Sequence, residues 1–86
     1  MNTISAIIVD DELHGRIVLK ELLGKFCKDV TIAGEAENIE DAYSLIREKK
    51  PELVFLDIQM PGGSGFELLK KFSSVGFDVI FFRSME

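Results

Sequence analysis

Two short apolar runs, each ending in carboxylates, constrain the fold of this chain more than any other feature. Residues 7–9 lead directly into Asp10 and Asp11, and residues 53–56 lead into Asp57. Runs this short, with no polar alternation, are typical of strands buried on both faces of a parallel sheet. The carboxyl ends of parallel strands share one edge of an open α/β sheet, where such folds place their chemistry. We therefore expect Asp10, Asp11 and Asp57 to converge at that edge.

Convergence of three carboxylates predicts a bound cation. Like charges held close together repel and raise one another's pKa, and a hard cation relieves that repulsion. Mg²⁺ suits the arrangement because it binds through one or two carboxylates, keeps several waters and completes its octahedron with substrate phosphate. Once the metal shields its charge, one carboxylate can act as a nucleophile towards phosphorus. The two motifs thus predict Mg²⁺-dependent phosphoryl chemistry.

Strand and helix patterns alternate along the rest of the chain. We expect strands at residues 4–9, 30–34, 53–56 and 78–82. We expect helices from residue 11 or 12 to about 26, from 39 to about 49 and from 65 to about 72, with residues 35–37 forming a loop. Alternation of this kind indicates βαβ units with right-handed crossovers. The predicted fold class is α/β, a three-layer sandwich.

Local signals mark the helices. An apolar stripe at spacings of three and four is expected to turn the first helix towards the sheet. The stripe consists of Val18, Leu19, Leu22, Leu23 and Phe26. Asn38 is a good N-cap for the second helix, and Pro51 stops it. Ser64 and Glu67 have the spacing of a capping box and predict the start of the third helix.

Composition limits the classes of function. Eighty-six residues allow one small domain. A net charge of −5 argues against a nucleic-acid surface in this segment. No apolar run approaches the ~20 residues of a membrane span. The single cysteine, Cys27, allows no intramolecular disulfide and is expected to be a small core residue. A reducing, cytoplasmic location fits.

Three motifs carry a resemblance to a known family. They are Val-Asp-Asp-Glu at 9–12, Asp-Ile-Gln-Met-Pro-Gly at 57–62 and Ser-Gly-Phe-Glu at 64–67. Together they resemble the receiver domain of bacterial two-component response regulators, over residues 4 to about 82. The amino-acid sequence at 56–69 and 77–81 is most similar to that of receivers that precede LytTR-type DNA-binding domains. The resemblance implies a flavodoxin-like, doubly wound parallel sheet, here with about four strands in the order 2-1-3-4 and three helices.

The resemblance also implies roles for individual residues. Asp57 would be the phosphoacceptor, which attacks a phosphohistidine of a partner histidine kinase. Asp11 and Asp57 would be direct Mg²⁺ ligands, the backbone carbonyl of Gln59 a further ligand, and Asp10 would orient a water ligand. The chain would be a stoichiometric phosphoacceptor and not an enzyme, apart from slow self-dephosphorylation.

The C-terminal end departs from the family pattern. The sequence stops at Glu86, so we expect a single receiver-like domain, residues 1–86, without the family's last helix-strand-helix portion and its phosphate-pairing lysine. The family's Thr or Ser at the end of the fourth strand aligns with Arg83, or with Ser84 if the register slips by one. Arg83 could replace it as a phosphate ligand, since guanidinium binds phosphate well. The alternative is that residues 83–86 are a divergent tail.

Three functions therefore compete. The first is a phosphoaccepting receiver. The second is a receiver-derived interaction module that binds a partner or itself, with phosphotransfer impaired. A homodimer is expected, through the exposed edge of the fourth strand or by exchange of the C-terminal segment. The third is a phosphohydrolase with Asp57 as its nucleophile, but the haloacid-dehalogenase type needs a second Asp where this chain has Gln59.

Overall fold

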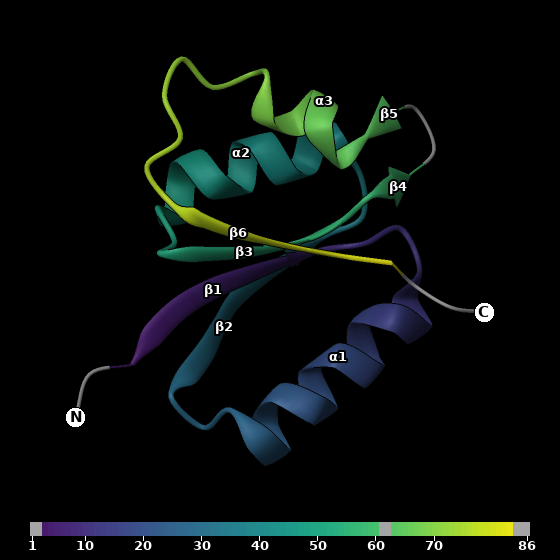
Figure 1. Cartoon of the computed structure of the whole chain (residues 1–86), viewed down its shortest axis with the longest axis vertical. Coiled ribbons are helices and arrows are strands. Elements are labelled where there is room, and N and C mark those ends of the chain that lie inside the picture. Colours follow the sequence, from purple (N-terminus) through teal and green to yellow (C-terminus); the bar gives the residue numbers. More distant parts are fainter. Residues whose placement is uncertain (1–2, 61–62, 84–86) are drawn as a thin grey trace.

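Four parallel strands form the main sheet of the computed structural model, which describes residues 3–60 and 63–83. They pair in the order β2-β1-β3-β6 (Figure 1). The long elements, in chain order, are β1 (Ile4–Val9), α1 (Leu13–Phe26), β2 (Val30–Ala36), α2 (Ile39–Lys49), β3 (Leu53–Asp57), α3 (Gly65–Leu69) and β6 (Asp78–Phe82). The predicted fold class, strand order and number of helices are confirmed.

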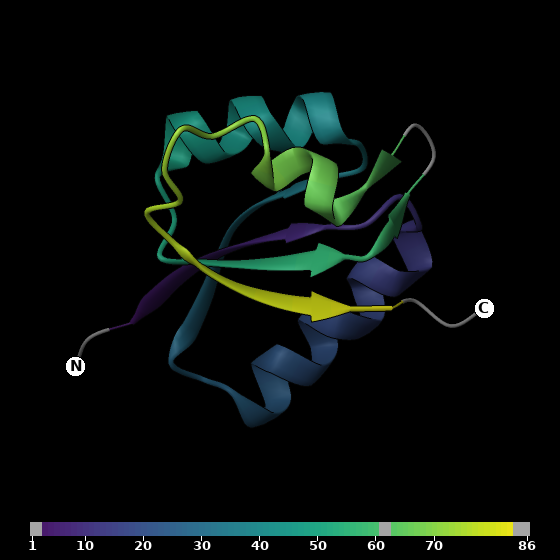
Figure 2. The same cartoon turned by 45° about the horizontal axis from the view of Figure 1, so that its top comes forward.

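The helices cover the sheet unequally. In Figures 1 and 2, α1 lies on one face, and α2 and α3 lie on the other. Alternate residues of β1 supply the two cores: Ile7 and Val9 pack with α2 and α3, whereas Ala6 and Ile8 pack with Leu23 of α1. This alternation is why Ala6–Val9 of β1 and Leu53–Leu56 of β3 are apolar without a break.

The apolar stripe of α1 only partly faces the sheet. Leu23 is buried, but Val18, Leu22 and Phe26 are 39%, 49% and 71% exposed. These three residues were predicted to face the sheet, but all three are exposed, and Val18 and Leu22 line a groove together with Phe82 of β6. Between α1 and the end of β6 lies a groove of about 440 Å³. The prediction for Cys27 is also wrong, since it is exposed just beyond the end of α1.

Strand β2 runs further than the sequence predicts. Residues 35 and 36, which were expected in a loop, continue the ladder with β1 because the register shifts between Ala6 and Ile7. Ala6 pairs with Ile32, but Ile7 pairs with Gly34, so β2 carries one extra residue at this point. The extension carries Glu35 along the edge of the sheet to the end of β1.

The segment after β3 also differs from prediction. A short antiparallel ladder, β4 (Gln59–Met60) with β5 (Gly63–Ser64), lies between β3 and α3, where no strand was predicted. Ser64 does lie at the N-cap of α3, but its side chain makes no capping hydrogen bond. Helix α3 ends at Leu69 and not near Phe72, because the amides of Lys71 and Phe72 donate to carbonyls only three residues back, as in a tightening turn. By contrast, Asn38 caps α2 as predicted, accepting the backbone N–H of Asp41 at 2.8 Å.

Candidate functional site

Three carboxylates meet at the carboxyl edge of the sheet. Asp10 and Asp11 follow β1, and Asp57 ends the neighbouring strand β3, whose Leu56 pairs with Val9. One carboxylate oxygen from each of the three lies within 4.8 Å of the others. Asp10 is 0% and Asp57 3% exposed, while Asp11 is half-buried. The expected convergence is therefore found, and the site is open to solvent on the side of Asp11.

Backbone hydrogen bonds fix the position of Asp10. Its N–H donates to the carbonyl of Ala36 at 3.0 Å, which continues the β1–β2 ladder by one residue. Its carboxylate accepts the N–H of Glu12 at 3.0 Å, and its carbonyl accepts a guanidinium N–H of Arg16. A carboxylate removed from water needs such donors. The residue is thus held on three sides at the point where β1 turns into α1.

The position of Asp57 depends on a close approach between β3 and α3. Phe82 of β6 pairs with Asp57, and the next amide, that of Ile58, donates to the carbonyl of Phe82 at 3.0 Å. The N–H of Gly65 then donates to the carbonyl of Ile58 at 3.0 Å. A Cβ atom on Gly65 would lie 2.8 Å from both the carbonyl oxygen of Asp57 and Cγ of Leu56. Only glycine lets the start of α3 come this close to the end of β3.

The other residues predicted to belong to the site, Gln59, Arg83 and Ser84, are not part of the group of three carboxylates. Gln59 begins β4, two residues after Asp57, and its carbonyl as a metal ligand stays a prediction. Arg83 directly follows β6 at the same end of the sheet, is exposed, and lines the groove beside α1 together with His14 and Phe82. Among the described residues, no ion pair joins Arg83 to Asp57. Ser84 lies outside the described residues.

Sequence reasoning missed a cluster of charges next to the site. Glu35 accepts Nε–H of Arg16 at 3.1 Å and Nζ–H of Lys20 at 2.7 Å. The hydrogen bond from Lys20, with the charges of Lys20 and Arg16, lowers the pKa of the Glu35 carboxyl against an opposing effect of burial. Two cations four residues apart on α1 were a usable signal, but their partner was assigned to a loop.

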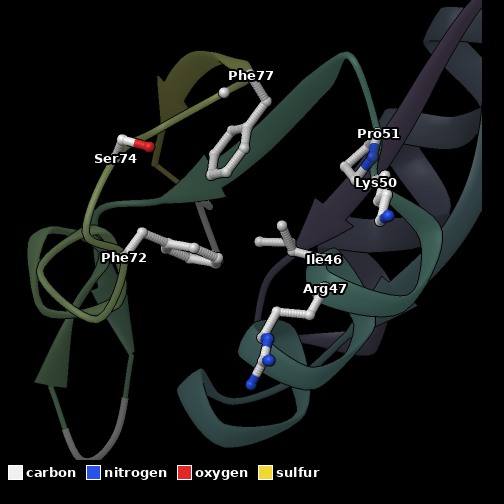
Figure 3. Close-up of a pocket in the computed structure, with 8 residues that line it drawn as sticks. Ile46, Arg47, Lys50, Pro51, Phe72, Ser74 and Phe77 are labelled. Carbon is white, nitrogen blue, oxygen red and sulfur yellow. The ribbon is translucent and has the colours of Figure 1, made fainter.

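A second cavity lies at the other end of the sheet. It has a volume of about 460 Å³ and lies between the end of α2 and the loop that precedes β6. Figure 3 shows the rings of Phe72 and Phe77 on one side of it and Ile46 and Pro51 on the other. Pro51 and Phe77 come just before β3 and β6, so the cavity lies at the amino ends of the strands. It holds none of the three carboxylates and is not the site of the predicted chemistry.

Comparison with known proteins points to a single family. The response regulator receiver domain profile matches residues 6–84. The chain is 45% identical over 65 residues to the sensory transduction protein LytT of Bacillus anthracis, covering 76% of this chain and 26% of that protein. It is 47% identical over 66 residues to an uncharacterized response regulatory protein of Shewanella oneidensis, covering 77% of this chain and 28% of that protein.

Solved structures agree as well. A DNA-binding response regulator of the LuxR family from Staphylococcus aureus superposes with a TM-score of 0.81 at 34% identity. The match covers 91% of this chain and 66% of that one. The chain thus spans about a quarter of the length of the two curated relatives and about two thirds of the solved structure.

Gly65→Ala should destabilise the protein by roughly 1–3 kcal/mol, the usual cost of overpacking, because the new methyl would meet backbone at Asp57. Gly24→Ala is the matched control. Gly24 lies inside α1 with nothing within 4 Å of the added Cβ, so the change should stabilise by about 0.5–1 kcal/mol. Urea unfolding measures both. Equal and favourable effects would contradict the tight contact at Gly65.

Glu35→Gln should remove a pH-dependent contribution to stability. Because the pKa of Glu35 is lowered on folding, its ionised form stabilises the native state at neutral pH, and this stabilisation is lost as pH falls below 4.5 through the native pKa. The difference in unfolding free energy between wild type and Glu35→Gln should be largest near pH 7 and shrink in acid. The neighbouring exposed Glu37→Gln serves as control. A difference for Glu35→Gln that stays constant with pH would rule out this linkage.

Proposed function

Because the chain belongs to the family of response regulator receiver domains, we propose that it accepts a phosphoryl group on Asp57 from a histidine kinase in a Mg²⁺-dependent reaction. The observation that carries the proposal is the group of three carboxylates, two of them buried, with oxygens within 4.8 Å of one another. Such a group is strongly repulsive unless a cation or a proton neutralises it. One of its members ends a central strand, where nucleophiles of open α/β sheets are found.

The donor set fits Mg²⁺, which is a hard cation that prefers oxygen ligands. Asp11 and Asp57 would hold the ion directly, with the backbone carbonyl of Gln59 as a further ligand, and Asp10 would orient a water in its shell. When bound, the ion neutralises charge on the carboxylates and on the transferred phosphoryl group. The chain itself supplies the fixed positions of the oxygens.

The chemistry required of Asp57 is a single displacement. A carboxylate oxygen of Asp57 attacks the phosphorus of the donor phosphohistidine, an O–P bond forms, and the P–N bond breaks. The departing imidazole takes up a proton, and Asp57 keeps the phosphoryl group as an acyl phosphate. Positioning and charge neutralisation provide the catalysis. Arg83 is proposed as a phosphate contact because of its place beside Phe82, and Ser84 is kept as the other candidate.

A second function is favoured by apolar surface around β6. Among the described strands, β6 pairs with β3 alone, so one of its edges is open to another chain. Phe66, Ile80 and Phe81 are 52%, 48% and 37% exposed, and the rings of Phe66 and Phe81 lie 4.9 Å apart. Burying one such side chain is worth about 1.5–3 kcal/mol. The alternative proposal is a homodimerisation module with impaired phosphotransfer.

The wider setting is proposed on the same basis. The partner is a sensor histidine kinase, the location is the cytoplasm, and this acidic segment does not itself bind nucleic acid. Within residues 3–60 and 63–83, no helix is long and apolar enough to cross a membrane.

A small phosphodonor with Mg²⁺ should modify the wild-type chain once, giving an adduct that is stable in acid and labile in base. Asp57→Ala should abolish the adduct, and Asp11→Ala should abolish Mg²⁺ binding in a calorimetric titration. Asp29→Ala, which changes an exposed carboxylate in the turn between α1 and β2, is the control and should leave both unchanged. An adduct that persists in Asp57→Ala would contradict the assignment of Asp57 as the phosphoacceptor. Repeated turnover of a phosphoester would indicate a phosphohydrolase instead.

If β6 forms a dimer edge, the sedimentation coefficient should rise with protein concentration. Phe81→Lys should shift the equilibrium to monomer by placing a charge in the contact. Val75→Lys, at an apolar position in the loop before β6 that is 45% exposed, should leave the equilibrium unchanged. A chain that stays monomeric at millimolar concentration would eliminate the dimerisation module.

A further inference from the structure

The structure assigns a positioning role to Arg16. Its guanidinium holds the backbone at Asp10 and is not itself one of the proposed metal ligands. This inference rests on the proposed function, because it concerns how the carboxylates are presented to Mg²⁺. The guanidinium of Arg16 joins two otherwise separate parts of the site. One N–H donates to the carbonyl of Asp10, and Nε–H donates to the Glu35 carboxylate at 3.1 Å.

The contact with Asp10 determines the orientation of Asp11. The carbonyl of Asp10 and the N–H of Asp11 belong to one planar peptide unit, so fixing the carbonyl also fixes the direction in which the chain enters Asp11. The other side of Asp10 is already held through its N–H and the carbonyl of Ala36. Arg16 therefore limits the rotation of that peptide, and so fixes the backbone position from which the half-buried Asp11 carboxylate, proposed as a direct ligand, extends.

Glu35 keeps Arg16 in place. The side chain of Arg16 is 11% exposed and that of Glu35 27% exposed, so their ion pair is partly shielded from water. The second carboxylate oxygen of Glu35 accepts Lys20 at 2.7 Å, which ties Glu35 to the next turn of α1. A guanidinium presents several N–H groups in a fixed plane and can serve two acceptors in different directions. A lysine ammonium at position 16 lacks that fork.

Charge and position predict opposite effects on metal binding. Arg16 is a cation beside a site that binds a cation, so electrostatics alone says that removing its charge should strengthen Mg²⁺ binding. If Arg16 positions the ligands, removing it should weaken Mg²⁺ binding, as loss of a group that orients a metal ligand typically does by about 10–100-fold. The sign of the change separates the two roles.

The test compares Arg16→Met with Lys20→Met in calorimetric titrations with MgCl₂ at a temperature where both variants are folded. Each variant loses one positive charge bonded to Glu35, but only the first loses the contact with Asp10. Arg16→Met should weaken binding at least tenfold, whereas Lys20→Met should leave it unchanged or slightly tighter. Arg16→Lys, which keeps the charge without the fork, should resemble Arg16→Met. Mg²⁺ affinity in Arg16→Met equal to or above that of Lys20→Met overturns the inference.

A second measurement is independent of the metal. In metal-free protein, the amide resonance of Asp11 should shift and broaden in Arg16→Met, with a smaller shift in Glu35→Gln and none in Lys20→Met. If Arg16→Met does not fold, Arg16→Lys and Glu35→Gln carry both measurements. Absence of Mg²⁺ binding in the wild type would reject the proposed function, whereas an undisturbed Asp11 amide would reject the role of Arg16.

Discussion

Mutual repulsion of three carboxylates is the constraint on which the rest of this structure depends. Asp10, Asp11 and Asp57 are brought within 4.8 Å by two adjacent strands, and two of them are withdrawn from water. An arrangement so unfavourable persists only where surrounding structure fixes it. Here the fixing groups are the β1–β2 ladder, the Arg16–Glu35 pair and the start of α3. Each acts on backbone at the end of a strand, and the N–H of Glu12 adds a direct hydrogen bond to the Asp10 carboxylate.

The two ends of the sheet are specialised differently. The carboxyl end concentrates negative charge and places it next to the N-terminal turn of α1. The amino end carries a cavity of about 460 Å³, lined by Phe72, Phe77, Ile46 and Pro51, with Arg47 and Lys50 also contributing. Convergent polar groups, and not the size of a hollow, identify the chemical site.

The central part of the fold was predictable because its signals are local. Apolar runs followed by carboxylates mark β1 and β3, and Asn38 and Pro51 bound α2 as predicted. Several of the failures concern longer-range packing. The stripe of α1 indicates an amphipathic helix, but only the finished sheet shows that Leu23 lies over it while Phe26 does not. Likewise Leu68, fully buried in α3, could not be distinguished from the exposed Phe66 by hydrophobicity alone. Arg16 was missed because its partner, Glu35, lies nineteen residues away. Glu35 also belongs to a strand that was predicted to end one residue before it.

The single extra residue in β2 decides which side of the sheet Glu35 occupies. In a strand, neighbouring side chains point to opposite faces, so a shift by one residue inverts every later position. With the shift at Ala6 and Ile7, Glu35 pairs with Ile8, whose side chain belongs to the core beneath α1. Without it, Glu35 would pair with Val9 and point its carboxylate into the apolar core on the α2 side. The number of residues in β2 is therefore more tightly constrained than the identity of most of them. This segment should tolerate substitutions far better than insertions or deletions of one residue.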